Sequence, residues 1–67
     1  MPVKVRKLKA ELRKAGFYSR PAKGSHTRWH YQYDPSIFVT LSGSDGDDAD
    51  AYQIKDVRNA LKRAKEK

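Results

Sequence analysis

The chain has 67 residues, with 15 lysines and arginines against eight aspartates and glutamates, no cysteine, and a formal net charge of +7. This length predicts one small domain, residues 1–67, with a thin core and no room for a pocket that encloses a substrate. The lack of cysteine excludes a disulfide scaffold and a thiolate zinc site. No segment approaches the ~18 apolar residues of a membrane span and no signal peptide is visible, so we expect a cytoplasmic protein without a membrane partner.

The charge is distributed in blocks along the chain. Residues 1–33 hold nine Lys and Arg against one Glu, and residues 34–56 hold six Asp against one Lys. Residues 57–67 are basic again, with five Lys and Arg against one Glu. Blocked basicity on a small domain suggests a polyanionic partner, most often nucleic acid, although a merely solvated surface gives the same pattern.

Residues 3–15 are predicted to form a helix. Their apolar members recur at the spacing of one helical stripe, at Val5, Leu8, Leu12 and Ala15. Pro2 suits the first turn of this helix, where a missing N–H costs nothing. Gly16 suits a left-handed position just beyond its end.

Three antiparallel strands are expected next. Residues 17–22 read as a short edge strand, because Pro21 cannot donate a hydrogen bond to a ladder. After a turn at the Gly-Ser pair, residues 26–33 form the second strand. Residues 34–36 have turn chemistry, and residues 37–41 are β-branched and apolar as a strand requires.

The second strand alternates between polar and aromatic side chains. One parity holds His26, Arg28, His30 and Gln32. The other holds Thr27, Trp29, Tyr31 and Tyr33. Because successive strand side chains point to opposite faces, one face of this strand can bury while the other keeps its histidines exposed.

Residues 42–50 form a loop rich in Ser, Gly and Asp before a second helix at about residues 52–65. The loop lacks the final glutamate and the preceding helix of a calcium-binding EF-hand, so we predict no metal site. Asp50 and Gln53 have the spacing of a capping box, and the other aspartates are expected near the positive end of the second helix. The apolar stripe of that helix consists of Ile54, Val57, Leu61 and Ala64.

The predicted fold class is therefore α+β, with the order α-β-β-β-α. A three-stranded antiparallel sheet packs both helices on one face, since neither helix is stable alone at this length. The sheet residues expected to meet the helices are Trp29, Tyr31, Ile37, Val39 and Leu41. The opposite face stays open, as antiparallel sheets allow, and carries His26, Arg28 and His30.

Two sequence blocks then resemble a known family. The run Lys14-Ala15-Gly16-Phe17, followed by Lys23-Gly24-Ser25-His26, is similar to the signature of HicA-type toxins of bacterial toxin–antitoxin modules. The tail resembles a variant subgroup at Ser42-Gly43, Gly46-Asp47-Asp48-Ala49, Tyr52-Gln53, Val57 and Ala60. The resemblance implies a fold like a double-stranded RNA-binding domain, cleavage of mRNA, and a HicB-like antitoxin partner. The functional histidine of the family corresponds to His26.

RNA carries its own nucleophile, the 2′-OH, so its cleavage needs proton transfers that an imidazole can perform and requires no metal or other cofactor. His26 is the candidate general acid or base. The candidate RNA contacts are Lys23, Gly24, Ser25, Arg28, Arg20 and His30, of which the cations would stabilise phosphate charge. His30 shares the strand face and is also a candidate complementary proton-transfer partner on the same phosphate. Commoner members of the family have an arginine where this chain has Pro21, one residue from Arg20.

Two other functions are consistent with the same residues. A non-catalytic RNA-binding module would recognise phosphates and 2′-OH groups without using an imidazole. An inactive toxin-like protein would bind an antitoxin and nothing else. Turnover of single-stranded RNA by the purified protein distinguishes the enzyme from both alternatives. Trp29 is a candidate for base stacking, but its parity with Tyr31 favours the core.

Overall fold

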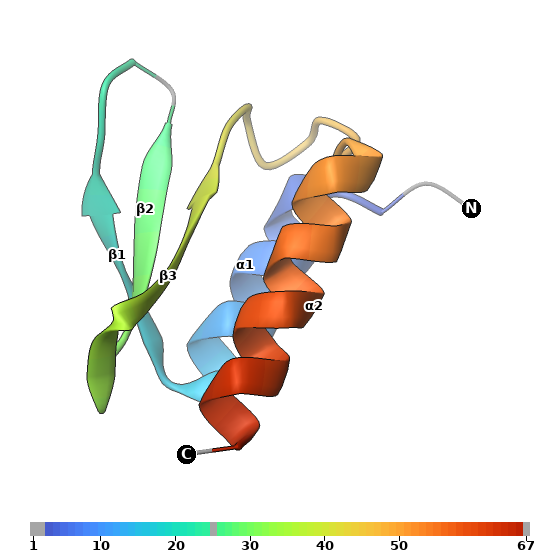
Figure 1. Cartoon of the computed structure of the whole chain (residues 1–67). Coiled ribbons are helices and arrows are strands. Elements are labelled where there is room, and N and C mark those ends of the chain that lie inside the picture. Colours follow the sequence, from blue (N-terminus) through green and yellow to red (C-terminus); the bar gives the residue numbers. More distant parts are fainter. Residues whose placement is uncertain (1–2, 25, 67) are drawn as a thin grey trace.

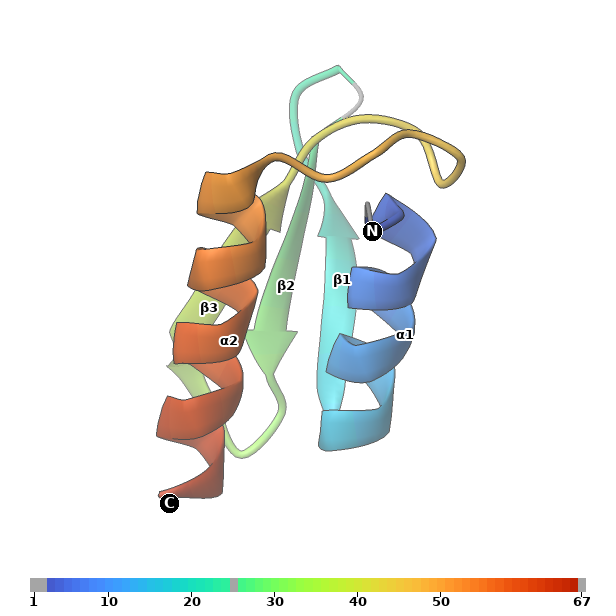
Figure 2. The ribbon, with the colours of Figure 1, turned by 90° about the vertical axis from the view of Figure 1, so that its right-hand side faces the viewer.

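The computed structural model describes residues 3–24 and 26–66 and confirms the predicted α-β-β-β-α order. Its elements are α1 (Val5–Ala15), β1 (Phe17–Pro21), β2 (Thr27–Tyr31), β3 (Asp34–Leu41) and α2 (Ala51–Lys65). The strands form one antiparallel sheet in the order β1-β2-β3 (Figure 1). Both helices lie on the same face of this sheet, and no described element covers the other face (Figure 2). In the described part of the chain, neither helix has the length and apolarity to cross a membrane.

The core lies between the sheet and the two helices. Trp29 is its largest fully buried side chain, and its indole N–H donates to the hydroxyl of Thr27 at 3.0 Å. The predicted helix-facing residues of the sheet are buried, except for Tyr31, which is partly buried at the edge of the core. The described members of the core cluster are Leu8, Leu12, Phe17, Trp29, Ile37, Val39, Leu41, Val57, Ala60 and Ala64.

The predicted first helix is confirmed with a later start. It begins at Val5 rather than at residue 3, and Lys4 is its N-cap residue. The interpretation of Pro2 lies outside the described residues. Ala15 is exposed rather than part of the buried stripe, because the chain turns away from the helix at the next residue.

Gly16 ends α1 in the left-handed conformation that the sequence predicted, with φ of 101°. A Cβ at this position would lie 3.0 Å from Nε2 of Gln32, the end of an exposed side chain that can move, so the backbone conformation is what favours glycine. We expect Gly16→Ala to lower the free energy of unfolding by about 1–2 kcal/mol, the cost of a left-handed residue with a Cβ. Urea unfolding followed by circular dichroism measures this change. The matched control is Gly46→Ala, where φ is not positive and a Cβ meets nothing within 4 Å.

The turn between the second and third strands does not lie where the sequence predicted it. Residues 32–33 form the hairpin turn, and β3 already begins at Asp34. In the ladder, His30 pairs with Phe38 and Tyr31 pairs with Asp34, so residues 35–37 bulge out of register. The turn chemistry is present but forms the bulge, where the Asp34 carboxylate accepts from the N–H and the hydroxyl of Ser36 at 3.2 and 2.6 Å.

The loop at residues 42–50 packs against the start of α1. The N–H groups of Val5 and Arg6 donate to the backbone carbonyls of Asp47 and Asp45, at 2.9 and 3.2 Å. The first turn of a helix has N–H groups without intrahelical partners, and the loop satisfies two of them. The sequence placed these aspartates near the start of the second helix, whereas the backbone carbonyls of Asp45 and Asp47 accept from the first.

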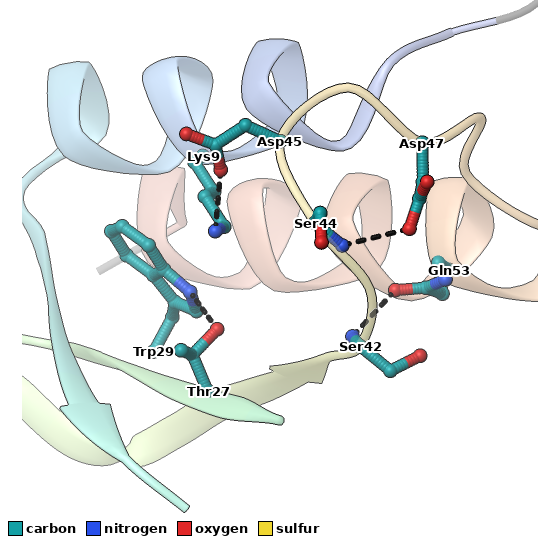
Figure 3. Close-up of polar contacts among 8 residues, drawn as sticks. All are labelled: Lys9, Thr27, Trp29, Ser42, Ser44, Asp45, Asp47 and Gln53. Carbon is teal, nitrogen blue, oxygen red and sulfur yellow. Dashed lines mark hydrogen bonds and ion pairs between the residues drawn. The ribbon is translucent and has the colours of Figure 1, made fainter. Parts of the chain in front are cut away.

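Two aspartate side chains of this loop pair with lysines at the start of the chain and in α1. Lys4 Nζ lies 2.7 Å from a carboxylate oxygen of Asp48. Lys9 Nζ lies 2.7 Å from a carboxylate oxygen of Asp45, as Figure 3 shows. The hydrogen bond and the charge of Lys9 lower the pKa of Asp45 below its ordinary value of 3.8. The carboxylate is thus ionised at neutral pH, and its partner is a cation of the protein itself.

The predicted capping box at the start of α2 is only partly correct. Asp50 is the N-cap residue, but its side chain makes no capping hydrogen bond. The side-chain oxygen of Gln53 instead accepts from the N–H of Ser42 at 3.0 Å (Figure 3). Gln53 is buried, so this bond joins the end of β3 to the first turn of α2. Sequence spacing alone could not reveal that the amide had a partner eleven residues away.

Candidate functional site

The open face of the sheet presents its side chains in rows that cross the strands. The ladder aligns Tyr18 with His30 and Arg20 with Arg28. Beyond β2, the backbone N–H of Ala22 donates to the carbonyl of His26 at 3.1 Å, which continues the pairing by one more row. The alternation predicted for residues 26–33 holds as far as Tyr31, because Trp29 is buried while Arg28 is exposed. It fails at residues 32–33, which form the hairpin turn, and Tyr33 is exposed rather than buried.

His26 stands where the β1–β2 turn enters β2. Its backbone is held on both sides, since its N–H also donates to the carbonyl of Lys23 at 3.2 Å. Its side chain is exposed and makes no hydrogen bond or ion pair within residues 3–24 and 26–66. A fixed backbone with an uncommitted imidazole suits a group that transfers protons to or from a bound molecule.

A shallow hollow of about 280 Å³ on the open face brings His26 together with two of the predicted cations. Lys23 and Arg28 line it, with Ala22 and Thr40. A phosphate in this hollow would meet one imidazole and two positive charges. This is the arrangement required to neutralise a phosphate while a proton moves.

An adjoining hollow of about 510 Å³ extends this site toward the other predicted contacts. Arg20 and His30 line it, and it shares Lys23 and Arg28 with the first hollow. His30 is half-buried, and its Nδ1 lies 3.0 Å from the carbonyl oxygen of Pro35. A carbonyl can only accept, so this nitrogen of His30 carries the proton.

His30 does not suit the role of a second proton-transfer group on the phosphate that His26 meets. Four residues of extended strand separate the two histidines by about 13 Å. That is too far for both rings to contact one phosphate. His30 therefore stays a candidate RNA contact only.

The turn at residues 23–25 is described in part. Gly24 adopts a positive φ of 66° and is exposed, with open space where a Cβ would be. Ser25, the third predicted turn contact, lies outside the described residues. Gly24 thus brings Lys23 back beside His26, which is the role that the sequence assigned to this turn.

The sequence interpretation missed two aromatic side chains of the open face. Tyr18 and Phe38 are 38% and 51% exposed and flank His30 on β1 and β3. The strand parity of Phe38 was readable: Ile37 and Val39 were assigned to the core, so the residue between them had to face the other way. Attention to polar and charged candidates left them out.

A third hollow of about 450 Å³ runs along the edge between β3 and α2 and also reaches His26. From α2 it is lined by Tyr52, Asp56, Asn59 and Arg63, among others. The closeness of the second helix to His26 was not readable from the sequence. Among the described residues, no three His, Asp or Glu side chains gather as a metal site requires.

Fold and site together define a small, basic, two-layer α+β domain whose uncovered sheet face holds an exposed histidine among lysine and arginine side chains. Residues 5–65 match the family described as HicA toxin of bacterial toxin–antitoxin, and the chain belongs to that family. It is thus a toxin-type component of a toxin–antitoxin module, and the family implies an antitoxin partner. Comparisons with curated proteins and with solved structures gave no significant match.

Proposed function

We propose that this HicA-family chain is an endoribonuclease that cleaves single-stranded mRNA, with His26 as its general acid or base. The observation that carries the proposal is the hollow in which His26 meets Lys23 and Arg28. This hollow is open to the surface, so a long polymer can lie across it, as a domain too small to enclose a substrate requires. Its mRNA substrate places the proposed activity in the cytoplasm.

The proposed reaction uses the 2′-OH of the substrate as nucleophile. An imidazole removes the proton of that hydroxyl or protonates the departing 5′-oxygen, and either role is open to His26. Lys23 and Arg28 stabilise the negative charge that develops on the phosphate oxygens. The products of this route are a 2′,3′-cyclic phosphate and a free 5′-hydroxyl, so no metal-bound water is needed.

We further propose that the antitoxin partner is of the HicB type and covers the open sheet face. The strands contribute Arg20 and Arg28 to that face, and an acidic partner surface would complement them. Such a partner would occupy the position of the RNA, and binding of one would then exclude the other. The same face would thus serve both the activity and its control.

The decisive test of the proposed activity compares two versions of one substrate. Purified protein is incubated with a labelled single-stranded RNA oligonucleotide and with the same oligonucleotide carrying 2′-deoxy sugars. We expect cleavage of the RNA, with cyclic phosphate ends, and none of the deoxy substrate. Equal cleavage of both would rule out the 2′-OH mechanism. Binding without cleavage of either would show that the protein is a non-catalytic RNA-binding module.

A further inference from the structure

Three aromatic rings form a continuous row across the open face of the sheet. Tyr18, His30 and Phe38 pair in register on β1, β2 and β3. The rings of Tyr18 and His30 are stacked with centroids 5.8 Å apart, and those of His30 and Phe38 are tilted with centroids 5.6 Å apart. We call these three side chains the aromatic row.

The aromatic row is exposed although the protein has a second layer that could have covered it. Both helices lie on the opposite face of the sheet (Figures 1 and 2). A single exposed ring needs no explanation, but a row of rings across three strands is a candidate contact surface. Tyr18 and Phe38 are exposed there, and His30 between them is half-buried.

The neighbouring side chains indicate the chemistry of a partner that would fit this surface. The next row carries Arg20 and Arg28, whose guanidinium carbons lie 6.0 Å from the ring centre of Tyr18 and 5.4 Å from that of Phe38. The only carboxylate in the described strands is Asp34, which pairs with the helix-facing Tyr31. The open face thus combines flat rings with positive charge, the combination that binds single-stranded nucleic acid.

We propose that the aromatic row stacks bases of single-stranded RNA, while Arg20 and Arg28 contact the phosphates between those bases and His26. This inference rests on the proposed RNA substrate and adds the path of the RNA across the sheet, from His26 to the aromatic row. The aromatic row lies about 13 Å along β2 from His26, beyond hydrogen-bond reach. It therefore binds nucleotides that flank the cleaved phosphodiester. Stacking needs unpaired bases, so the site selects single strands over duplexes.

The experiment measures binding without cleavage. His26→Ala protein is titrated into a fluorescein-labelled, 2′-O-methyl RNA single strand of about 12 nucleotides, within the range of single-stranded sites, and anisotropy is followed. Adding Tyr18→Ala and Phe38→Ala should weaken binding by about 5-fold to 150-fold for each base that loses its ring. The slope of log affinity against log salt should not change. By contrast, the double change Arg20→Ala, Arg28→Ala should make that negative slope shallower, by about 0.7 for each lost phosphate contact.

Two controls keep this result specific to the aromatic row. Tyr33→Ala removes a ring that is 75% exposed in the β2–β3 turn, and we expect unchanged affinity. Phe38→Leu keeps an apolar side chain that can pack but cannot stack, and Phe38→Trp restores a stacking surface. Affinity should fall in the Phe38→Leu protein and recover in the Phe38→Trp protein. Both should keep the circular dichroism spectrum of the parent.

The proposal would be overturned if the Tyr18→Ala, Phe38→Ala protein bound the single strand within twofold of its parent. It would also be overturned if a duplex of the same sequence bound as tightly as the single strand. Because binding is measured without His26, a failure of the proposed cleavage leaves this result unaffected. A loss of stacking, in turn, does not decide whether His26 is catalytic.

Discussion

Replacement of His26 by alanine should abolish growth arrest and lower the rate of RNA cleavage by about 10²–10⁴-fold, the usual contribution of a general acid or base. The physical reason is the position of the ring. The imidazole is exposed, has no partner in the described residues, and shares a hollow with Lys23 and Arg28. No other imidazole would reach a phosphate bound in that hollow, because His30 lies about 13 Å from His26 along the strand.

The measurement has a cellular and a purified arm. The toxin and its His26→Ala variant are expressed from a tightly repressed promoter, with growth and message ends followed after induction. The purified proteins are then compared on one RNA oligonucleotide at equal concentration. The matched control is Arg58→Ala, which removes an exposed cation from α2 and should leave cleavage intact. Undiminished arrest and cleavage by a folded His26→Ala protein would show that His26 is not the proton-transfer group.

The fold was predictable because local signals agree with one another along most of the chain. The stripes containing Leu8 and Val57, the glycine at position 16 and the alternation around Trp29 each indicate the same two-layer arrangement, and the structure has it. The errors arose where one residue type serves several local structures. The Asp-Pro-Ser run at 34–36 has turn chemistry, yet it makes a bulge inside β3 instead of the hairpin turn.

The loop at residues 42–50 shows a second limit, because its partners are distant in the sequence. Nothing near Asp45 in the sequence reveals that its carboxylate pairs with Lys9. The capping-box spacing at Gln53 was likewise a local signal. The side-chain oxygen of Gln53 accepts instead from the backbone N–H of Ser42. The partners of such side chains are set by contacts between segments far apart in the chain. A single sequence does not reveal which segments meet.

The candidate site was predictable in its parity but not in its extent. Alternation placed His26, Arg28 and His30 on one face, and the family signature singled out His26. The width of the site depends on which residues of β1 and β3 stand beside β2. Parity alone puts Phe38 on the open face, but only the register shows that Tyr18 and Phe38 stand beside His30.

The largest change in stability should come from Trp29→Ala. Trp29 is 1% exposed, and its indole N–H donates to the hydroxyl of Thr27. The guanidinium carbon of Arg13 lies over the indole, 5.1 Å from the ring centre. Removal of a buried tryptophan costs about 3–5 kcal/mol. A domain of this size has about 3–10 kcal/mol of stability in all, so the variant should lose from about a third to all of it. Urea unfolding must be followed by far-ultraviolet circular dichroism, because the change removes the only tryptophan.

The matched variant Trp29→Phe separates the buried ring from its hydrogen bond. It keeps an aromatic side chain in the core and loses the indole N–H, so the expected cost is about 1–2 kcal/mol and the chain should stay folded. A Trp29→Ala protein that unfolds at the same urea concentration as its parent would contradict the central place of this indole in the core.

The two tryptophan variants also test how the site depends on the fold. Trp29 and His26 lie on opposite faces of the same strand, so the ring contacts the helices and never the open face. Trp29→Ala should therefore lose cleavage together with its circular dichroism signal, whereas Trp29→Phe should keep both. His26→Ala should keep the signal and lose only cleavage. A folded but inactive Trp29→Phe protein would instead place the indole in the site, and would mean that the parity argument for the open face is wrong.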